Sequence, residues 1–283
     1  MPNIQRRRAN PHNNLIVISD THCGCQVGLL PRWGCKLDDK LVVKPSKYQR
    51  VIWNCWEEFW GEWVPRVTKR EPFCVAHLGD AVDGDHHGSK SQISTNMDIQ
   101  RGIAEDCLKP VVERCEGRYY HVRGTEAHVG KSGECEENLA KALGAIPDRE
   151  GRRARWVLWK RVGPFLFNLL HHIGTTGSSA YESTAVYKEL TEAYVEAGRW
   201  NEEAPQGIVR GHRHRNFECR VPSANGYAMA IVVAGWQLHT PFAYRIPGAR
   251  QSEPQIGGTL IRVGDEEPFA RHRVWHMARP AAE

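Results

Sequence analysis

Two histidines one residue apart follow a short apolar run near the last third of the chain. Residues 208–210 lead directly into Gly211-His212-Arg213-His214. Alternate side chains of an extended segment point the same way, so His212 and His214 can offer their imidazoles to one site. Imidazole binds metals and carries protons near neutral pH. The function of these two histidines therefore depends on which other side chains reach the same site.

Three other apolar runs also end in side chains that bind metals. They are residues 15–18 before Asp20 and His22, residues 73–78 before Gly79-Asp80, and residues 165–170 before His171-His172. Ligands of an open α/β sheet bind in the crevice outside the carboxyl ends of its strands. We therefore expect all four strand ends to share one crevice.

Aspartate and histidine without cysteine suit divalent cations such as Mn, Fe and Zn. Two aspartates and several histidines are more than one tetrahedral zinc site needs. This surplus predicts two divalent metal ions (Mn, Fe or Zn). In two-metal sites, cations roughly 3.5–4 Å apart hold the attacking and leaving oxygens of a phosphoryl displacement.

The order of these blocks resembles the calcineurin-like metallophosphoesterases. The matching blocks are Asp20-Thr21-His22, Gly79-Asp80, Gly124-Thr125-Glu126-Ala127-His128, His171-His172 and Gly211-His212-Arg213-His214. The family pattern is Asp-x-His, Gly-Asp, Gly-Asn-His, His and Gly-His-x-His, so only the third block departs from it. That block, with Cys23-Gly24 and His86-His87-Gly88, is similar to the subset of the family found in phages and prophages.

The resemblance implies a role for each matching residue. Asp80 would bridge the two cations, a role that suits a carboxylate because it has two oxygens. The remaining ligands of the first cation would be Asp20, His22 and His214. The second cation would take His212 and either His171 or His172. We favour His171, the first residue past its strand, because adjacent side chains alternate in direction.

The third block leaves one ligand and the proton donor open. The family places a metal-binding asparagine where this chain has Thr125, and Glu126 stands beside it. A carboxylate is the better ligand for Mn or Zn, so we expect Glu126 to substitute, with Thr125 as the alternate. His128 would protonate the leaving group. The alternative is a degenerate turn without catalytic residues.

Further polar residues flank these blocks. Asp83 is expected to assist catalysis by orienting a metal ligand. His86 and His87 either contact the substrate phosphate or are incidental. Arg123 and Arg213 are candidates for binding a phosphate with the guanidinium fork, whereas Arg215 is expected to be solvated.

The helices and strands expected around these residues indicate an α/β fold, a two-sheet β-sandwich flanked by helices. We expect helices at 48–63, 94–115, 132–143 and 181–197. We expect strands at 118–122, 156–162 and 165–170 and, after the last motif, at 217–221, 227–238, 259–263 and 269–276. The aromatic stripe of the first helix is typical of a core face.

The 283 residues are compatible with one domain over 14–283, preceded by a flexible basic segment over 1–13. The long loop at 23–46 has a length that favours a functional role such as a lid. The nine irregularly spaced cysteines indicate reduced thiols. No run approaches the ~18 apolar residues of a membrane span, and the N-terminus lacks a signal sequence. We therefore expect a cytoplasmic protein without membrane contact. The resemblance to the phage and prophage subset implies that a phage or prophage encodes it.

The leading interpretation is a phosphoesterase in which a metal-bound hydroxide attacks phosphorus. The net charge of +5 permits an acidic substrate, and the basic segments favour a phosphodiester of a nucleic acid or nucleotide. One alternative is a phosphomonoesterase acting on a phosphoprotein or a small molecule. Another is a binding or structural protein that keeps the fold without catalysis.

Overall fold

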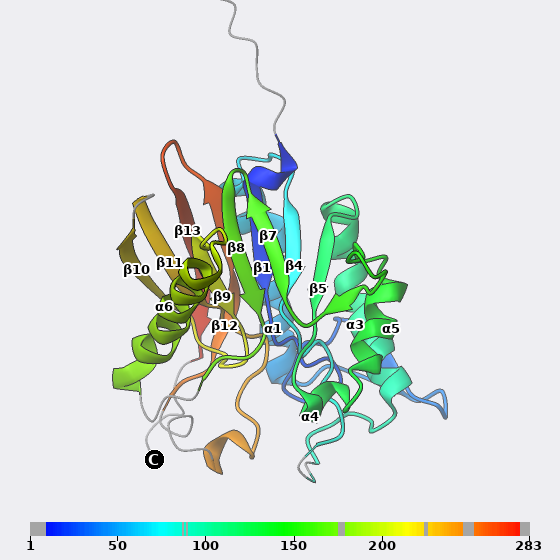
Figure 1. Ribbon diagram of the computed structural model, residues 1–283. Helices are drawn as coiled ribbons and strands as arrows, with labels where there is room; N and C mark the ends of the chain where they lie inside the picture. The colour runs from blue at the N-terminus through cyan, green and yellow to red at the C-terminus, as the bar shows by residue number, and fades with distance from the viewer. Residues whose placement is uncertain are drawn as a thin grey trace, which may run out of the picture.

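Two β-sheets face each other in the computed structural model, which describes residues 10–86, 88, 90–174, 179–223, 226–245 and 252–277 (Figure 1). The six-stranded sheet has the order β13 (Pro268–His276), β12 (Gln255–Val263), β1 (Asn14–Ile18), β4 (Cys74–His77), β5 (Tyr119–Val122) and β6 (Ala154–Arg155). The five-stranded sheet has the order β10 (Phe217–Ser223), β11 (Gly226–Val232), β9 (Gly207–Arg210), β8 (Phe165–Leu170) and β7 (Leu158–Val162). The predicted two-sheet α/β architecture is confirmed.

The central strand β1 shows why the sheets stack. Its side chains alternate between two layers, because successive residues of a strand point to opposite faces. Leu15 and Val17 pack between the sheets against residues of the five-stranded sheet such as Val209. Ile16 and Ile18 pack on the other face, against the helices. Every residue of β1 is buried, as expected for a strand covered on both sides.

Helices cover both outer faces of the sandwich. The six-stranded sheet is covered by α1 (Lys47–Glu58), α3 (Met97–Arg114) and α5 (Glu134–Ala142), and α6 (Glu182–Trp200) packs on the five-stranded sheet. Two short helices, α2 (Val64–Val67) and α4 (Glu126–Val129), lie in the connections, as do the 3-10 turns η1 (Pro11–Asn13), η3 (Ser179–Tyr181) and η4 (Ala243–Arg245). The outer layers therefore hold the sheets rigidly beneath the loops at one end.

The expected single helix at 48–63 is interrupted. It runs as α1, then a wider π turn, η2 (Phe59–Trp63), and then α2. Pro65 has no N–H to donate to the preceding turn, and a local widening accommodates it. The aromatic stripe lies in the core: Trp56, Phe59 and Trp236 pack ring against ring, with centroids 4.7–5.5 Å apart.

The strand expected at 227–238 is too long. Strand β11 ends at Val232, and the chain then leaves the sheet toward the loops. Gly235 lies close to the site, because a Cβ there would lie 3.0 Å from the His214 ring and 3.1 Å from Asp20 Cβ. The segment after Val232 therefore passes directly beneath the strand-end residues.

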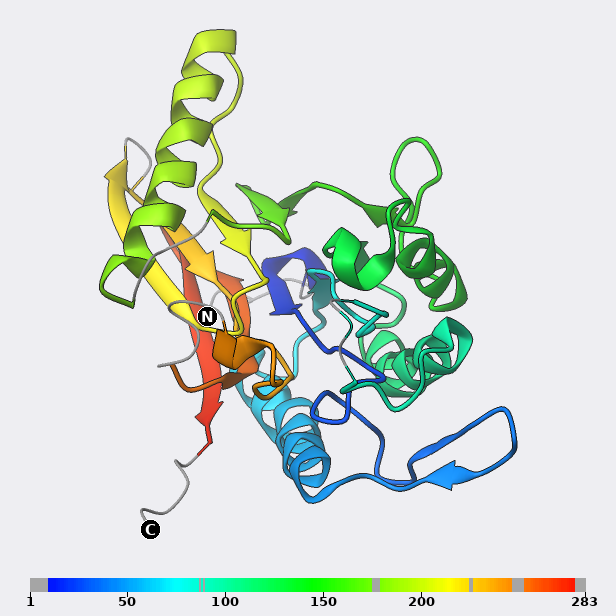
Figure 2. The ribbon, with the colours of Figure 1, turned by 90° about the horizontal axis from the view of Figure 1, so that it is seen from below.

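The segment at 23–46 has two parts. Its first part is tied to neighbouring loops, with the N–H of Cys23 donating to Ala81 O at 2.9 Å and that of Leu29 to Thr21 O at 3.0 Å. Its second part forms a small two-stranded ribbon, β2 (Cys35–Lys36) with β3 (Val42–Val43), which projects from the body in Figure 2. A lid role for this segment stays a prediction. The flexible lead-in falls outside the described residues at 1–9, while 11–13 form η1.

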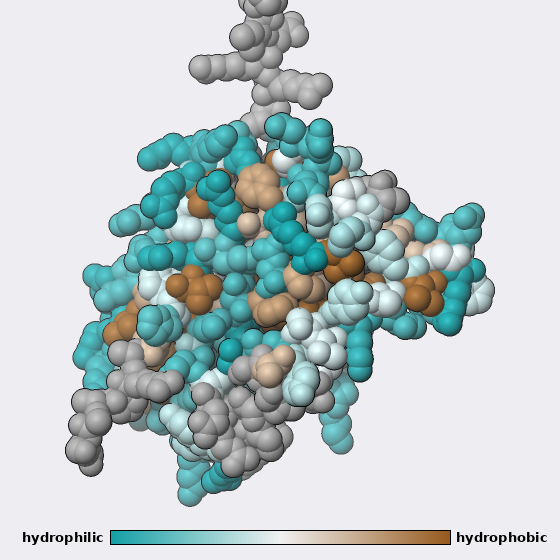
Figure 3. Space-filling model, turned by 90° about the vertical axis from the view of Figure 1, so that its left-hand side faces the viewer, coloured by the Kyte–Doolittle hydropathy of each residue, from teal (hydrophilic) through white to brown (hydrophobic). Residues whose placement is uncertain are grey.

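The face seen in Figure 3 is mostly hydrophilic, with small separate apolar areas. None of the helices in the described ranges is both long and apolar enough to cross a membrane.

Candidate metal centre

The loops that carry the motif residues gather at one end of the sandwich, which faces the viewer in Figure 2. Strands β1, β4 and β5 run parallel, and so do β8 and β9, so their carboxyl ends lie at the same end. The six-stranded sheet contributes Asp20, His22 and Asp80. The five-stranded sheet contributes His171, His212 and His214. The site is therefore assembled across both sheets.

The first group of ligand atoms comes from Asp20, His22 and His214. Their side-chain ligand atoms lie within 4.8 Å of one another. His214 Nε2 lies 3.3 Å from Asp20 Oδ1 and 3.1 Å from His22 Nε2. Two nitrogens that each lie ~2.1 Å from one cation are separated by about the distance between His214 Nε2 and His22 Nε2. The three residues thus fit a single cation.

The second group comes from Asp80, His171 and His212, again within 4.8 Å of one another. His171 Nε2 lies 3.0 Å from Asp80 Oδ2, and its Nδ1–H donates to Leu78 O at 2.5 Å. A backbone acceptor at Nδ1 leaves Nε2 available as a ligand, which is a frequent arrangement at metal sites. His172 is exposed and belongs to neither group.

His128 belongs to two further groups whose ligand atoms lie within 4.8 Å of one another, one with His22 and Asp80 and one with Asp83 and His86. Its Nδ1–H donates to Asp83 O at 2.5 Å, and its Nε2 lies 3.8 Å from Asp80 Oδ2. The ring also packs against His22 and His86, with centroids 4.5 and 4.3 Å away. Its Nε2 therefore faces the interior of the site.

The two candidate ligands of the third block, Thr125 and Glu126, have different surroundings. The N–H of Thr125 donates to Asp80 Oδ1 at 2.7 Å, and its hydroxyl lies 3.3 Å from both Asp80 oxygens. Thr125 thus holds the Asp80 carboxylate. The Glu126 side chain is exposed and belongs to none of the ligand groups found among the described residues.

Asp83 is placed behind His22. Its Oδ1 lies 3.3 Å from His22 Nδ1 and accepts a hydrogen bond from Gln237 Nε2 at 3.0 Å. This contact fixes the imidazole so that His22 Nε2 faces Asp20 and His214. His86 Nε2 lies 3.8 Å from the other Asp83 oxygen. His87, a candidate for substrate contact, lies outside the described residues.

The arginines differ in their surroundings. Arg123 donates from Nε to Ala154 O at 2.8 Å and from Nη1 to Ser132 O at 3.0 Å, so it fastens the loop rather than pointing into the site. Arg213 is half-buried beside the ligands. Arg215, which we expected to be solvated, instead pairs with Glu182 at 2.5 Å.

The charges of the site are strongly coupled. Burial opposes ionisation of Asp80, but His171 and His128 hold the pKa of its carboxyl far below the usual range. Burial likewise opposes protonation of His22, yet Asp20 and Asp83 raise its pKa to about 10. His171 has its pKa raised to about 9 against burial by Asp80 and Asp20. Without cations, the positive charges of these two imidazolium groups offset the negative charges of the neighbouring carboxylates.

The backbone of the site is unusual. Five proposed ligands have left-handed φ angles, namely Asp20 (56°), His22 (41°), Asp80 (52°), His212 (72°) and His214 (50°). Such conformations are costly for residues other than glycine and concentrate at functional sites. In addition, buried Asp20 Oδ1 takes no hydrogen bond within the described part of the chain. The ligand set, its spacing and this orphaned oxygen all fit divalent cations.

Sequence reasoning missed residues that act behind the ligands. His77 Nδ1 accepts the N–H of Gly79 at 3.1 Å, its Nε2 lies 3.2 Å from Thr21 Oγ1, and that hydroxyl donates to Ala81 O at 3.0 Å. These bonds join the loop after β1 to the loop after β4. A histidine inside an otherwise apolar strand was the only signal for this role.

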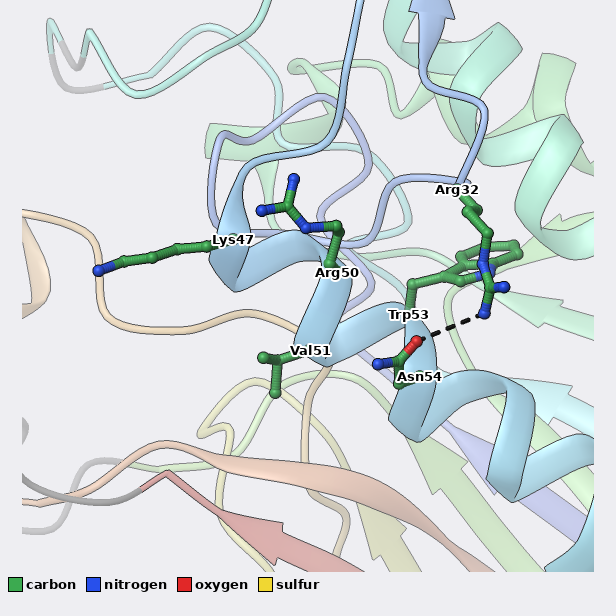
Figure 4. A pocket seen from close by; sticks show the side chains of 6 residues that line it. All are labelled: Arg32, Lys47, Arg50, Val51, Trp53 and Asn54. Atoms are coloured by element: carbon green, nitrogen blue, oxygen red, sulfur yellow. Dashed lines mark hydrogen bonds between the residues drawn. The ribbon is translucent and has the colours of Figure 1, made fainter.

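A surface pocket of about 620 Å³ lies on α1 and is lined by Arg32, Lys47, Arg50, Val51, Trp53 and Asn54 (Figure 4). Its cationic side chains do not converge on one point. Lys47 extends away from the others, and Arg32 turns to Asn54 and pairs with Glu57. The pocket therefore does not form a focused anion site.

The fold and the site define an α/β sandwich with a histidine- and aspartate-rich centre at one end of its strands. No protein-family model matches the chain, and no curated protein is similar to it in sequence.

Solved structures similar to it include a metallophosphoesterase from Sphaerobacter thermophilus, at 9% identity and a TM-score of 0.39, covering 94% of this chain and 89% of that one. A predicted phosphoesterase from Streptococcus pneumoniae has 10% identity and a TM-score of 0.35, covering 93% and 98%. Vacuolar Protein Sorting 29 from Cryptosporidium parvum has 11% identity and a TM-score of 0.35, covering 94% and 98%. The interpretation of the site rests on the motifs and the geometry described above.

Proposed function

We propose that the chain is a metal-dependent phosphoesterase that uses two divalent cations. The observation that supports this most strongly is the pair of ligand groups, Asp20 with His22 and His214, and Asp80 with His171 and His212. Support for Asp80 as the link between them comes from its ligand atom, which also lies within 4.8 Å of those of His22 and His128. When bound, the cations would neutralise charge on the phosphoryl group and activate water as the nucleophile.

The protein's own residues would position the groups that react. Asp80 would bridge the cations, and Thr125 holds its carboxylate in place. Asp83 would keep His22 turned toward the first cation. His128 would protonate the leaving oxygen from Nε2, because its Nδ1 is held by Asp83 O.

We infer a phosphodiester of a nucleic acid or nucleotide as the substrate. The net charge of +5 supports an acidic substrate. Hydrolysis of an alkyl phosphodiester expels an alkoxide, a poor leaving group, and His128 would supply its proton, as it would for an alkyl monoester. A monoesterase with the same centre is the second candidate.

The test uses protein reconstituted with Mn²⁺ or Zn²⁺ and compares a nucleic acid, a nucleotide diester and a phosphomonoester. We expect about two cations per chain and preferential cleavage of diesters. His128→Ala should slow cleavage of an alkoxide diester roughly 10²–10⁴-fold, but should hardly affect a nitrophenyl ester, whose leaving group needs no proton. Two bound cations with no cleavage of any ester would favour a binding protein instead.

A further inference from the structure

A carboxylate that the motifs do not include lies beneath the two central loops of the site. Glu136, in α5, is completely buried. Its Oε1 accepts the N–H of Ala81 at 2.9 Å, and its Oε2 accepts the N–H of Gly124 at 2.6 Å. Ala81 directly follows Asp80, and Gly124 directly precedes Thr125. One side chain therefore holds the backbone on both sides of the contact between Asp80 and Thr125.

These two loops touch backbone to backbone. A Cβ on Gly79 would lie 2.5 Å from Gly124 N, and a Cβ on Gly124 would lie 1.9 Å from Asp80 Oδ1. No side chain separates the loops, so their hydrogen bonds determine the position of Asp80. A buried N–H without an acceptor is destabilising. The N–H groups of Ala81 and Gly124 therefore depend on the acceptor below them.

The surroundings of Glu136 favour this two-point contact. Tyr119 OH lies 3.0 Å from His121 Nδ1, and His121 Nε2 lies 3.5 Å from Glu136 Oε1. With the hydroxyl donating to Nδ1, the proton of His121 is on Nε2 and faces the carboxylate. Only a carboxylate offers an acceptor atom to both backbone N–H groups. A glutamine would place its own NH₂ against one of them.

We propose that Glu136 is a positioning residue that fixes Asp80 relative to the Thr125 loop and thereby sets the affinity of the site for divalent cations. This rests on the proposed function, because it takes Asp80 as the bridging ligand. Hydrogen-bonding partners behind metal ligands typically change metal affinity roughly 10–100-fold.

The neighbouring residue on α5 provides a matched control. Glu137 also binds backbone N–H groups through its carboxylate, those of Arg153 at 3.1 Å and Ala154 at 2.8 Å, but these belong to the β6 region and not to the Asp80 loop. Toward the Thr125 loop it contacts only a side chain, Arg123 Nη2 at 3.4 Å, and none of the backbone N–H groups that Glu136 binds. Glu136→Gln should weaken Mn²⁺ binding, measured by titration calorimetry on the full chain, roughly 10–100-fold. Glu137→Gln should bind Mn²⁺ as the original protein does.

Hydrogen exchange of the metal-free protein gives a second readout that needs no cation. Glu136→Gln should speed exchange in residues 79–84 and 122–126, and Glu137→Gln should speed it near 152–155. If Glu136→Gln does not fold, Glu136→Asp replaces it. Aspartate keeps two acceptor oxygens on a shorter side chain, so we expect a smaller loss of Mn²⁺ affinity and a smaller increase in exchange.

The results separate this inference from the function. Unchanged Mn²⁺ affinity in Glu136→Gln, or equal losses in both variants, would overturn the positioning role. If the original protein binds neither Mn²⁺ nor Zn²⁺, the proposed function fails, and the exchange comparison still decides the role of Glu136. Unchanged exchange at 79–84 would then overturn that role as well.

Discussion

Asp80 is the residue that connects the two groups of candidate ligands, because it belongs to one and lies close to His22 of the other. It contacts His171, His128 and Thr125 at once, and its backbone is in the left-handed region. Most of these contacts use side chains far apart in sequence. Substitution of Asp80 should therefore reduce metal binding far more than substitution of a residue at the edge of the site.

The neighbours His171 and His172 make this difference testable. His171 is buried beside Asp80, whereas His172 is exposed. We expect Asp80→Asn to lose most of the bound metal, His171→Ala about half, and His172→Ala none. Elemental analysis after reconstitution measures this. Equal metal content in the two histidine variants would show that His171 is not a ligand.

The pH dependence of cation binding follows from the raised pKa values of His22 and His171, about 10 and about 9. With these pKa values both imidazoles would be imidazolium ions at pH 7 in the metal-free protein, and a cation must displace one proton from each. Apparent affinity should therefore rise as the pH rises from 6 toward 9, with release of close to two protons. Calorimetry in buffers of different ionisation enthalpy counts these protons. Affinity independent of pH would contradict the assignment of these ligands.

At the scale of elements, the site depends on how closely the loops after β4 and β5 approach each other. Gly79 and Gly124 make this approach feasible, since neither has a Cβ to separate the backbones. The left-handed φ of Gly79, 85°, is a further reason for glycine at that position.

Alanine at Gly79 should therefore destabilise the metal-free protein by roughly 2 kcal/mol or more, through strain and overlap. Gly102→Ala in α3 is the control, because an added Cβ there meets nothing within 4 Å. That change should stabilise the protein by about 0.5–1 kcal/mol. Urea unfolding measures both, and a harmless Gly79→Ala would show that the loops can separate freely.

The strand ends could be predicted from the sequence because each apolar run stops at its polar residues. Short-range patterns also predicted most helices. These patterns could not predict the direction of the Glu126 side chain, because it depends on the turn that begins α4. They also extended strand β11 too far, through Gly235. Glu136 was also beyond reach, since an acidic residue in a helix is normally solvent-exposed, and only tertiary packing buries this one.

For the whole molecule, the important feature is that the proposed ligands come from both sheets. Asp20, His22 and Asp80 follow strands of the six-stranded sheet, whereas His171, His212 and His214 follow strands of the five-stranded sheet. A cation bound by both sets links the two layers at one end. Its binding is therefore coupled to folding of the entire chain.

This coupling predicts a cation-dependent melting temperature. With Mn²⁺ at a hundredfold above its Kd, one occupied site adds about 2.7 kcal/mol, equivalent to roughly 5 °C for a chain of this length. A chelator should remove the shift, and Asp80→Asn should lack it. Differential scanning calorimetry checks this. The same shift in Asp80→Asn would place the stabilising cation elsewhere.

The left-handed backbone at five ligand positions has an evolutionary consequence. Aspartate and histidine adopt this conformation at a cost of order 1 kcal/mol each, whereas glycine adopts it freely. A descendant released from cation binding would gain stability by drifting to glycine or asparagine at these five places. Glycine or asparagine at these five positions would then indicate from the sequence alone that cation binding had been lost.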